Sequence, residues 1–381
     1  MRTKELQARI ARFQDNLPYT SAEYASRSWG HNLHSLCSYQ GKLKPSLAHW
    51  LVQSFTDRGS RVLDPIAGVG TVPFEAALNG RLTVANDLSP LAAVVAAAKV
   101  APPALEQALE DVRWLEQRMA DVEINDDDYK SATFGLNATV ADYYHPDTLV
   151  EVLKARRIMK EDGWDSRPFL WASALHVLHG NRPYALSRTS HPITPFSPKG
   201  EFEYRSLIDR VTRRINAALA VPLPSQFRPG SAHHGDFRDL ASKIETTFDA
   251  IITSPPFLGM RFDRPNWLRL WFCGWGQEDF NTRSLGFLER QQTRSRNCYE
   301  DFFAVSRKLI NDDGLLVMHL GSGSGNTGRH DMVGDLKGLA TGWFHLAGEV
   351  IEDVAHLEAH GLTDKGRRTT KHHLLFFTPG G

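Results

Sequence analysis

A strand–loop–helix–strand unit near the N-terminus constrains the fold of this chain more than any other feature. Residues 61–64 form a short apolar run that ends in an acid, and residues 65–71 form a loop that contains two glycines. The pattern then predicts a helix over 72–78 and a second strand over 82–85. Such a unit predicts a parallel α/β sheet, because a crossover helix joins two strands that run in the same direction.

The alternation of strands and helices resumes after a long interruption. Between residues 101 and 230 helical patterns dominate, which predicts a mainly helical insertion. Strand patterns return at 248–253 and 314–320, and two later runs predict an antiparallel hairpin that closes the sheet. The other expected elements are helices at 3–16, 46–56, 90–100, 104–121, 146–161, 168–179, 204–219 and 299–311, with the hairpin strands at 344–351 and 373–377.

The charge of the chain is balanced. Its 381 residues include 44 Lys and Arg against 44 Asp and Glu. The length suits one large α/β domain with an insertion, or two domains. The zero formal charge argues against a protein that holds nucleic acid through overall positive charge. It does not exclude a local basic groove.

The cysteines and the N-terminus favour a cytoplasmic protein. Cys37, Cys273 and Cys298 are widely spaced and include no CxxC pair, so we expect reduced thiols and neither a zinc site nor a disulfide framework. Residues 1–17 lack the apolar core of a signal peptide, and no apolar stretch approaches the roughly 20 residues that span a bilayer. The histidines show no ligand spacing, so no metal is expected.

The loop after the first strand reads Asp-Pro-Ile-Ala-Gly-Val-Gly-Thr and opens a helix. Gly68 and Gly70 allow a sharp turn and a close approach of a ligand, and the helix N-terminus offers free N–H groups. Pro73 stands where a dinucleotide-binding fingerprint has its third glycine. Asp64 can pair with an amino group and Asp87 with ribose hydroxyls, which describes S-adenosylmethionine better than NAD.

A second loop, Ser-Pro-Pro-Phe, follows the strand at 248–253 and is stiffened by Pro255 and Pro256. An aromatic amino group is a poor nucleophile because its lone pair is delocalised into the ring. The Ser254 hydroxyl and the Pro255 carbonyl could accept its two N–H groups and free the lone pair to attack a sulfonium methyl. Phe257 could stack on a base swung out of a duplex. The loop therefore predicts catalysis mainly by positioning.

Together the two loops resemble those of the DNA amino-methyltransferases, which modify cytosine N4 or adenine N6. In that family DPFxGxGT is the cofactor loop, which this chain matches except that Ile66 replaces the usual Phe. The catalytic loop is (D/N/S)PP(Y/F), and its serine form is commoner among cytosine-N4 enzymes. The resemblance covers residues 28–100 and 232–325. It implies a Rossmann-like class I methyltransferase fold, with a mostly parallel twisted sheet, and S-adenosylmethionine as the cofactor.

The resemblance also implies roles for single residues. Tyr39 and Lys42 resemble the segment that packs over the methionine end of the cofactor, and Asp236 resembles the acid that contacts the adenine amine. The expected cofactor-binding residues are Tyr39, Lys42, Asp64, Ala67, Gly68, Gly70, Thr71, Asp87 and Asp236, and the expected catalytic residues are Ser254, Pro255, Pro256 and Phe257. The chain then divides into an N-terminal helix with the cofactor-binding half (1–100), a helical insertion that is a candidate for target recognition (101–230) and a catalytic half (231–381).

Arginines interleaved with aromatic residues are candidates for nucleic-acid contacts. After the catalytic loop, Arg261, Arg264 and Arg269 alternate with Trp267, Trp271 and Trp275. This combination suits phosphate contact and base stacking, with core packing of the tryptophans and a solvated arginine face as alternatives. The expected nucleic-acid-binding residues are Arg182, Arg188, Arg261, Arg264 and Arg294.

The first hypothesis is therefore a site-specific DNA methyltransferase acting on cytosine N4, as in restriction–modification systems. Its expected partners are DNA and a cognate restriction nuclease, and it would act as a monomer or dimer. Adenine N6 in DNA and an exocyclic amine in tRNA or rRNA remain open, and a non-catalytic cofactor-binding regulator is the alternative outside enzymes. Methylation of cytosine C5 is excluded, because the chain has no Pro-Cys pair to supply the thiolate.

Overall fold

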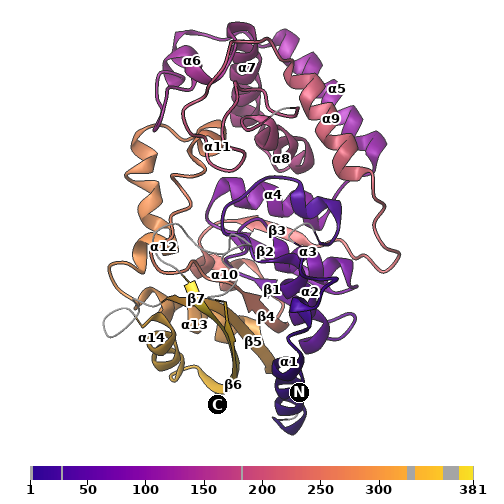
Figure 1. Ribbon diagram of the computed structural model, residues 1–381, viewed down its shortest axis with the longest axis vertical. Helices are drawn as coiled ribbons and strands as arrows, with labels where there is room; N and C mark the ends of the chain where they lie inside the picture. The colour runs from indigo at the N-terminus through magenta and orange to yellow at the C-terminus, as the bar shows by residue number, and fades with distance from the viewer. Residues whose placement is uncertain (1–2, 27–28, 182, 324–330, 355–368, 381) are drawn as a thin grey trace.

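A seven-stranded sheet forms the centre of the protein (Figure 1). The computed structural model describes residues 3–26, 29–181, 183–323, 331–354 and 369–380. The strand order is β3-β2-β1-β4-β5-β7-β6, with the first five strands parallel and β7 antiparallel to both of its neighbours. The strands are β1 (Arg61–Asp64), β2 (Leu82–Asp87), β3 (Ser231–His234), β4 (Phe248–Thr253), β5 (Ile310–Gly323), β6 (Phe344–Asp353) and β7 (Thr369–Pro379).

Side-chain alternation along the strands separates two hydrophobic layers. In β1, Val62 packs with the cluster on one face and Leu63 with the cluster on the other. Because successive residues of a strand point to opposite faces, an apolar strand of this kind must be covered on both sides. One face is covered by α1 (Thr3–Asn16), α2 (Pro45–Phe55) and α3 (Thr71–Leu78), and the other by α10 (Leu240–Lys243), α13 (Cys298–Leu309) and α14 (Met332–Ala340).

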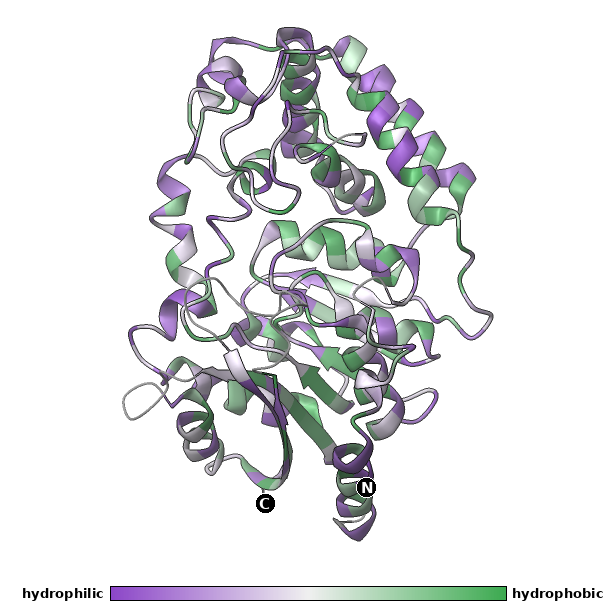
Figure 2. Cartoon of the chain, in the orientation of Figure 1, coloured by the Kyte–Doolittle hydropathy of each residue, from purple (hydrophilic) through white to green (hydrophobic). Residues whose placement is uncertain are grey.

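A second, helical layer lies beyond α4 (Pro90–Val100), which packs between the sheet and α8 (Pro168–Val177) (Figure 1). All residues of α8 from Phe169 to Val177 are buried, and Figure 2 shows it as mostly hydrophobic. The remaining helices of this layer are α5 (Leu105–Asp121), α6 (Asp126–Ser131), α7 (Pro146–Asp162), α9 (Leu207–Leu219) and α11 (Trp267–Phe272).

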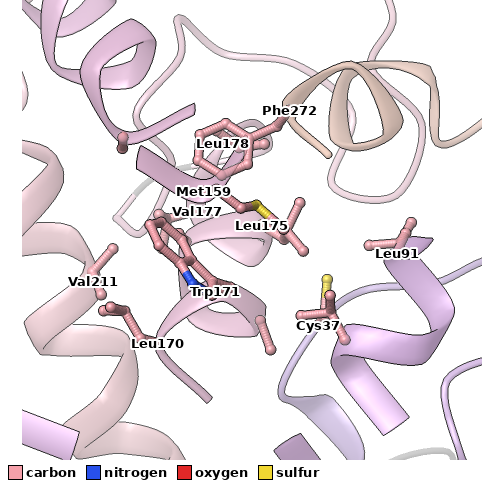
Figure 3. Packing of buried hydrophobic residues seen from close by; sticks show 14 of the residues in the cluster. Cys37, Leu91, Met159, Leu170, Trp171, Leu175, Val177, Leu178, Val211 and Phe272 are labelled. Carbon is pink, nitrogen blue, oxygen red and sulfur yellow. The ribbon is translucent and has the colours of Figure 1, made fainter. Parts of the chain in front are cut away.

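The helical layer draws on two separate segments of the chain. Trp171 and Leu175 of α8 pack with Met159 of α7 and Val211 of α9, which lie within 101–230 (Figure 3). Phe272 of α11 packs in the same cluster, although it follows the catalytic loop in the chain (Figure 3). The helical layer therefore extends beyond the segment 101–230 that the sequence marks as an insertion.

Most expected elements are present, and the differences have local causes. The expected strand 61–64, helix 90–100 and strand 248–253 agree with β1, α4 and β4 at both ends. The strand expected at 314–320 is longer, because β5 extends to Gly323 alongside β7. The sequence does not predict α6, α10, α11, α12 (Leu288–Gln291) or α14, since short helices carry too little periodicity to detect.

None of the helices in the described part of the chain has both the length and the apolar character that a membrane crossing needs. The three cysteines all occur as free thiols.

Candidate active site

The candidate site lies at the carboxyl ends of the central strands. β1 pairs in parallel with β2 on one side and with β4 on the other, so the chain order of the sheet reverses between β1 and β4. Open α/β sheets bind ligands at such a switch point. A cleft lies here, and both Gly68 of the first loop and Ser254 of the second line it.

The two glycines of the first loop have different structural roles. Both have positive φ, 52° at Gly68 and 70° at Gly70. A Cβ at Gly70 would lie 2.9 Å from Cβ of Ala96, so this glycine lets α3 pack closely on α4. A Cβ at Gly68 would meet nothing closer than 4.0 Å, at Tyr39, and would project where a ligand approaches the loop. Of the two, only Gly68 lines the cleft.

Two carboxyl groups, the buried Asp64 and the partly buried Asp87, line the cleft without an ion-pair partner among the described residues. The hydroxyl of Thr253 donates to Asp64 (2.6 Å), and the backbone N–H groups of Gly68 and Ser89 each donate to Asp87 (2.8 Å). Burial raises the pKa of Asp64 to about 7 and that of Asp87 to about 6. A cationic ligand would stabilise both in the ionised form.

The mouth of the cleft is formed by residues distant in sequence. The Tyr39 ring stacks on Phe262 with a centroid distance of 5.7 Å. Nζ of Lys42 donates to the carbonyl of His34 (2.8 Å), which leaves its other hydrogens for a ligand. Asp236 lies two residues beyond β3, where it accepts from the N–H and the guanidinium of Arg238. Its carboxylate therefore already has a cationic partner.

Eight of the nine residues expected to bind the cofactor line the cleft, and Gly70 is the exception. Two acids that line the cleft, Asp64 and Asp87, suit the ammonium and ribose groups of S-adenosylmethionine. Because Gly68 opens the loop backbone at the N-terminal end of α3, the residues present fit this cofactor.

The Ser254 loop, which the sequence predicts to be catalytic, projects into the same cleft through Ser254 and Pro256. Ser254 Oγ lies 3.1 Å from Nδ1 of His319 and 3.4 Å from its backbone carbonyl. Nε2 of Gln292 donates to the carbonyl of Pro256 (3.0 Å), which fixes the second half of the loop. Pro255 is buried and does not line the cleft.

Phe257 packs into the protein rather than lining the cleft. A Cβ at Gly321 would lie 2.4 Å from the Phe257 ring, so the ring rests directly on the β5 backbone. The imidazoles of His319 and His372 lie 5.4 Å and 5.9 Å from its centroid. The ring is only partly buried, so any base that stacks on it must use the remaining surface.

Three residues of the site lie outside any sequence motif, so the sequence alone does not identify them. Glu289, in α12 (Leu288–Gln291), lines the cleft and is 4% exposed, and burial raises its pKa to about 7. His319 and Gln292 hold the catalytic loop from β5 and from just beyond α12. Of the three, only His319 leaves a signal in the sequence. It is a polar residue inside an apolar strand, and a buried polar residue must find a hydrogen-bond partner.

The residues expected to contact nucleic acid fall into three groups. Arg188 donates to the carbonyls of Gly200 and Asp142, and Arg261 forms a two-point ion pair with the fully buried Asp263. Arg264 and Arg294 are exposed. Arg182 lies outside the described residues.

The tryptophans take the alternative of core packing that the sequence left open, and Arg269 is buried with them. Trp267, Trp271 and Trp275 are at most 2% exposed and belong to the helical core. The indole of Trp271 donates to the carbonyl of Ser131, and Arg269 donates to the carbonyl of Leu175. These side chains attach α11 to the helical layer, because a buried indole or guanidinium must find acceptors.

Comparison with known proteins gives a match over one segment and weaker structural likenesses. Residues 34–125 match the model of the family described as UPF0020: RMKL-like, methyltransferase domain. No curated protein matches the chain.

Three solved structures illustrate the likeness in fold. The rRNA methyltransferase AviRa from Streptomyces viridochromogenes is 12% identical with a TM-score of 0.36, over 93% of this chain and 92% of that one. The TehB-like SAM-dependent methyltransferase from Corynebacterium glutamicum is 10% identical with a TM-score of 0.32, over 99% and 98%. TrmN from Thermus thermophilus is 12% identical with a TM-score of 0.35, over 90% of this chain but 50% of that one. This chain therefore spans half the length of TrmN.

The class of the protein follows from the sheet, the cleft and the matched segment. The strand order, with β7 antiparallel between β5 and β6, is that of a Rossmann-like class I methyltransferase. The matched segment contains β1, the glycine loop and β2, which supply Asp64, Gly68 and Asp87 to the cleft. The matched segment is similar to a methyltransferase domain, and the lining of the cleft fits S-adenosylmethionine as the cofactor.

Proposed function

We propose that this protein is an S-adenosylmethionine-dependent methyltransferase that modifies the exocyclic amino group of a nucleic-acid base, and that cytosine N4 in DNA is its target. The observation that carries the proposal is the shared cleft. The loop that follows β1 and the Ser254 loop that follows β4 line one space, although 182 residues separate the DPxxGxGT segment from the SPPF segment. A methyl donor held by the first loop would therefore face an acceptor group held by the second.

The residues of this chain supply positioning rather than a strong base. Bound S-adenosylmethionine supplies an electrophilic methyl group. Ser254 Oγ would accept an N–H of the target amine and orient its lone pair, whereas the Pro255 carbonyl expected as a second acceptor belongs to a residue that does not line the cleft. Gln292 fixes the loop from behind through the carbonyl of Pro256, so the acceptor moves little when substrate binds.

Electrostatics in the cleft support the orientation of the cofactor. The ionised forms of Asp64 and Asp87 would hold the amino group of methionine and the ribose, and Lys42 lies on the same wall to meet a carboxylate. Asp236 would contact the adenine amine with the carboxylate surface that Arg238 leaves free. These contacts would direct the methyl group toward Ser254.

The proposal is tested by supplying labelled S-adenosylmethionine together with either duplex DNA or total RNA, followed by mass spectrometry of the nucleosides. Label in N4-methylcytosine from DNA is the expected result. Label in N6-methyladenine would keep the chemistry and change the target base. Label found only in RNA would overturn DNA as the substrate, and the absence of label from every base amine would overturn the proposal.

A further inference from the structure

The imidazole of His319 is hydrogen-bonded to the hydroxyl of Ser254. Thr253 of β4 is in register with Met318 of β5, which brings the next residue of each strand side by side at the edge of the cleft. Among the described residues, both hydrogen bonds of Ser254 Oγ are to His319, one to Nδ1 at 3.1 Å and one to the carbonyl at 3.4 Å.

The imidazole of His319 is held in one orientation at an energetic cost. It is 4% exposed, and its Nε2 is buried without a hydrogen-bond partner among the described residues. A buried polar atom without a partner destabilises a fold by about 1–3 kcal/mol. Phe257 packs at 5.4 Å and His372 edge-on at 4.8 Å, so the ring cannot turn freely to satisfy that atom. The orientation kept is the one that presents Nδ1 to Ser254.

The imidazole stays neutral. Burial, with His372 and His373 nearby, holds the pKa of His319 well below its ordinary value. If Nδ1 is the acceptor, the hydroxyl hydrogen of Ser254 points to it. If Nδ1 carries the hydrogen, it donates to Oγ and the hydroxyl hydrogen points to the His319 carbonyl. In both arrangements the hydroxyl hydrogen stays inside the protein and Oγ keeps a lone pair for the cleft.

We propose that His319 is a positioning residue that ties up the Ser254 hydroxyl hydrogen, so that Ser254 Oγ meets substrates only as an acceptor. The inference rests on the proposed function and deepens it, because it explains the choice of substrate. An acceptor at this place favours bases that present N–H groups, such as the amino groups of cytosine and adenine. It disfavours bases that present a keto oxygen there, because two acceptors would then face each other.

The test compares His319→Leu with His319→Asn, whose side-chain oxygen can stand near the place of Nδ1. His319→Leu is expected to lower kcat about tenfold, the equivalent of one hydrogen bond, with the cofactor Kd changed less than about twofold. His319→Asn is expected to recover kcat to within about threefold of wild type. The matched control is His373→Asn, because His373 pairs with Leu320 and so lies on the opposite face of the sheet.

A double-mutant cycle separates positioning from general support of the fold. In the Ser254→Ala background, His319→Leu is expected to cause no further loss of kcat, because its only route of action has been removed. Melting temperatures identify any variant that does not fold, and His319→Asn then carries the test. Wild-type kcat in His319→Leu, or losses that multiply independently in the double variant, would overturn the role of His319. A wild type that methylates no base amine would overturn the proposed function as well.

Discussion

The two walls of the cleft are built in different ways. The cofactor wall comes largely from one continuous segment, since Asp64, Gly68 and Asp87 lie within 24 residues and Asp87 accepts directly from the Gly68 N–H. The catalytic wall is assembled from distant parts, because Ser254 is held by His319, 65 residues away, and its loop by Gln292. A local segment can encode a cofactor site by itself, whereas the reactive loop depends on tertiary contacts. The predictions below test whether the two walls can be disabled separately.

The largest expected effect is on the catalytic wall. Ser254→Ala removes the proposed acceptor without touching the cofactor loop, so kcat is expected to fall about 10²–10³-fold, as when one preorganised polar contact is lost elsewhere. Cofactor binding, measured by calorimetry, should match wild type. Full turnover in Ser254→Ala would show that the two walls do not divide the work in this way.

The next effect concerns the cofactor wall. Asp87→Ala removes the carboxylate that accepts from Gly68 and Ser89, and the cofactor Kd is expected to rise about 10–100-fold, since hydrogen bonds to a charged group contribute about 1.5–3 kcal/mol. Turnover at saturating cofactor should largely recover. Asp87→Asn keeps an acceptor oxygen and serves as the control with a smaller loss. A fall in kcat that saturating cofactor does not restore would contradict the separation of the two walls.

A pH titration sharpens the same comparison. Burial raises the pKa of Asp64 to about 7, and only its ionised form pairs with an amino cation. As pH falls from 8 to 6 the ionised fraction drops, so the cofactor Kd is expected to rise about tenfold, with Asp87 adding to the effect at the lower end. In Asp64→Asn the cofactor Kd should be higher than in wild type at every pH. Its pH dependence should be much smaller, because the group that titrates near pH 7 is absent. An affinity that improves at low pH would contradict the assignment of Asp64.

The smallest expected effects concern the arginines outside the two walls. Arg264→Ala removes an exposed charge, so DNA affinity should weaken and the slope of log affinity against log salt should decrease by about 1, with an unchanged melting temperature. Arg188→Ala instead removes two bonds to backbone carbonyls and should lower the free energy of unfolding by about 1–2 kcal/mol. The reverse pattern would show that Arg188, not Arg264, faces the substrate.

The sequence predicts the sheet and the cofactor wall well, and the helical layer less completely. β1, α4 and β4 agree with expectation at both ends, because long apolar periodicity and clear turn residues mark them. The sequence left the tryptophans in and beside α11 between base stacking and core packing, since alternation with arginine is equally compatible with a buried helix whose polar groups bond to backbone carbonyls. Whether a helix is buried depends on what packs against it, and the sequence of a short segment does not identify its neighbours in the fold.

By itself the sequence determined the longer strands and helices and their order along the chain, the glycine loop with its two acids, and the identity of the second loop, because each depends on residues close together in the chain. Only the tertiary structure decided that Gly70 packs α3 on α4 while Gly68 faces the cleft, that Phe257 rests on Gly321, and that His319 meets Ser254. The physical reason is that strand pairing sets these distances: the register of β4 on β5 brings together two side chains that nothing in the local sequence connects.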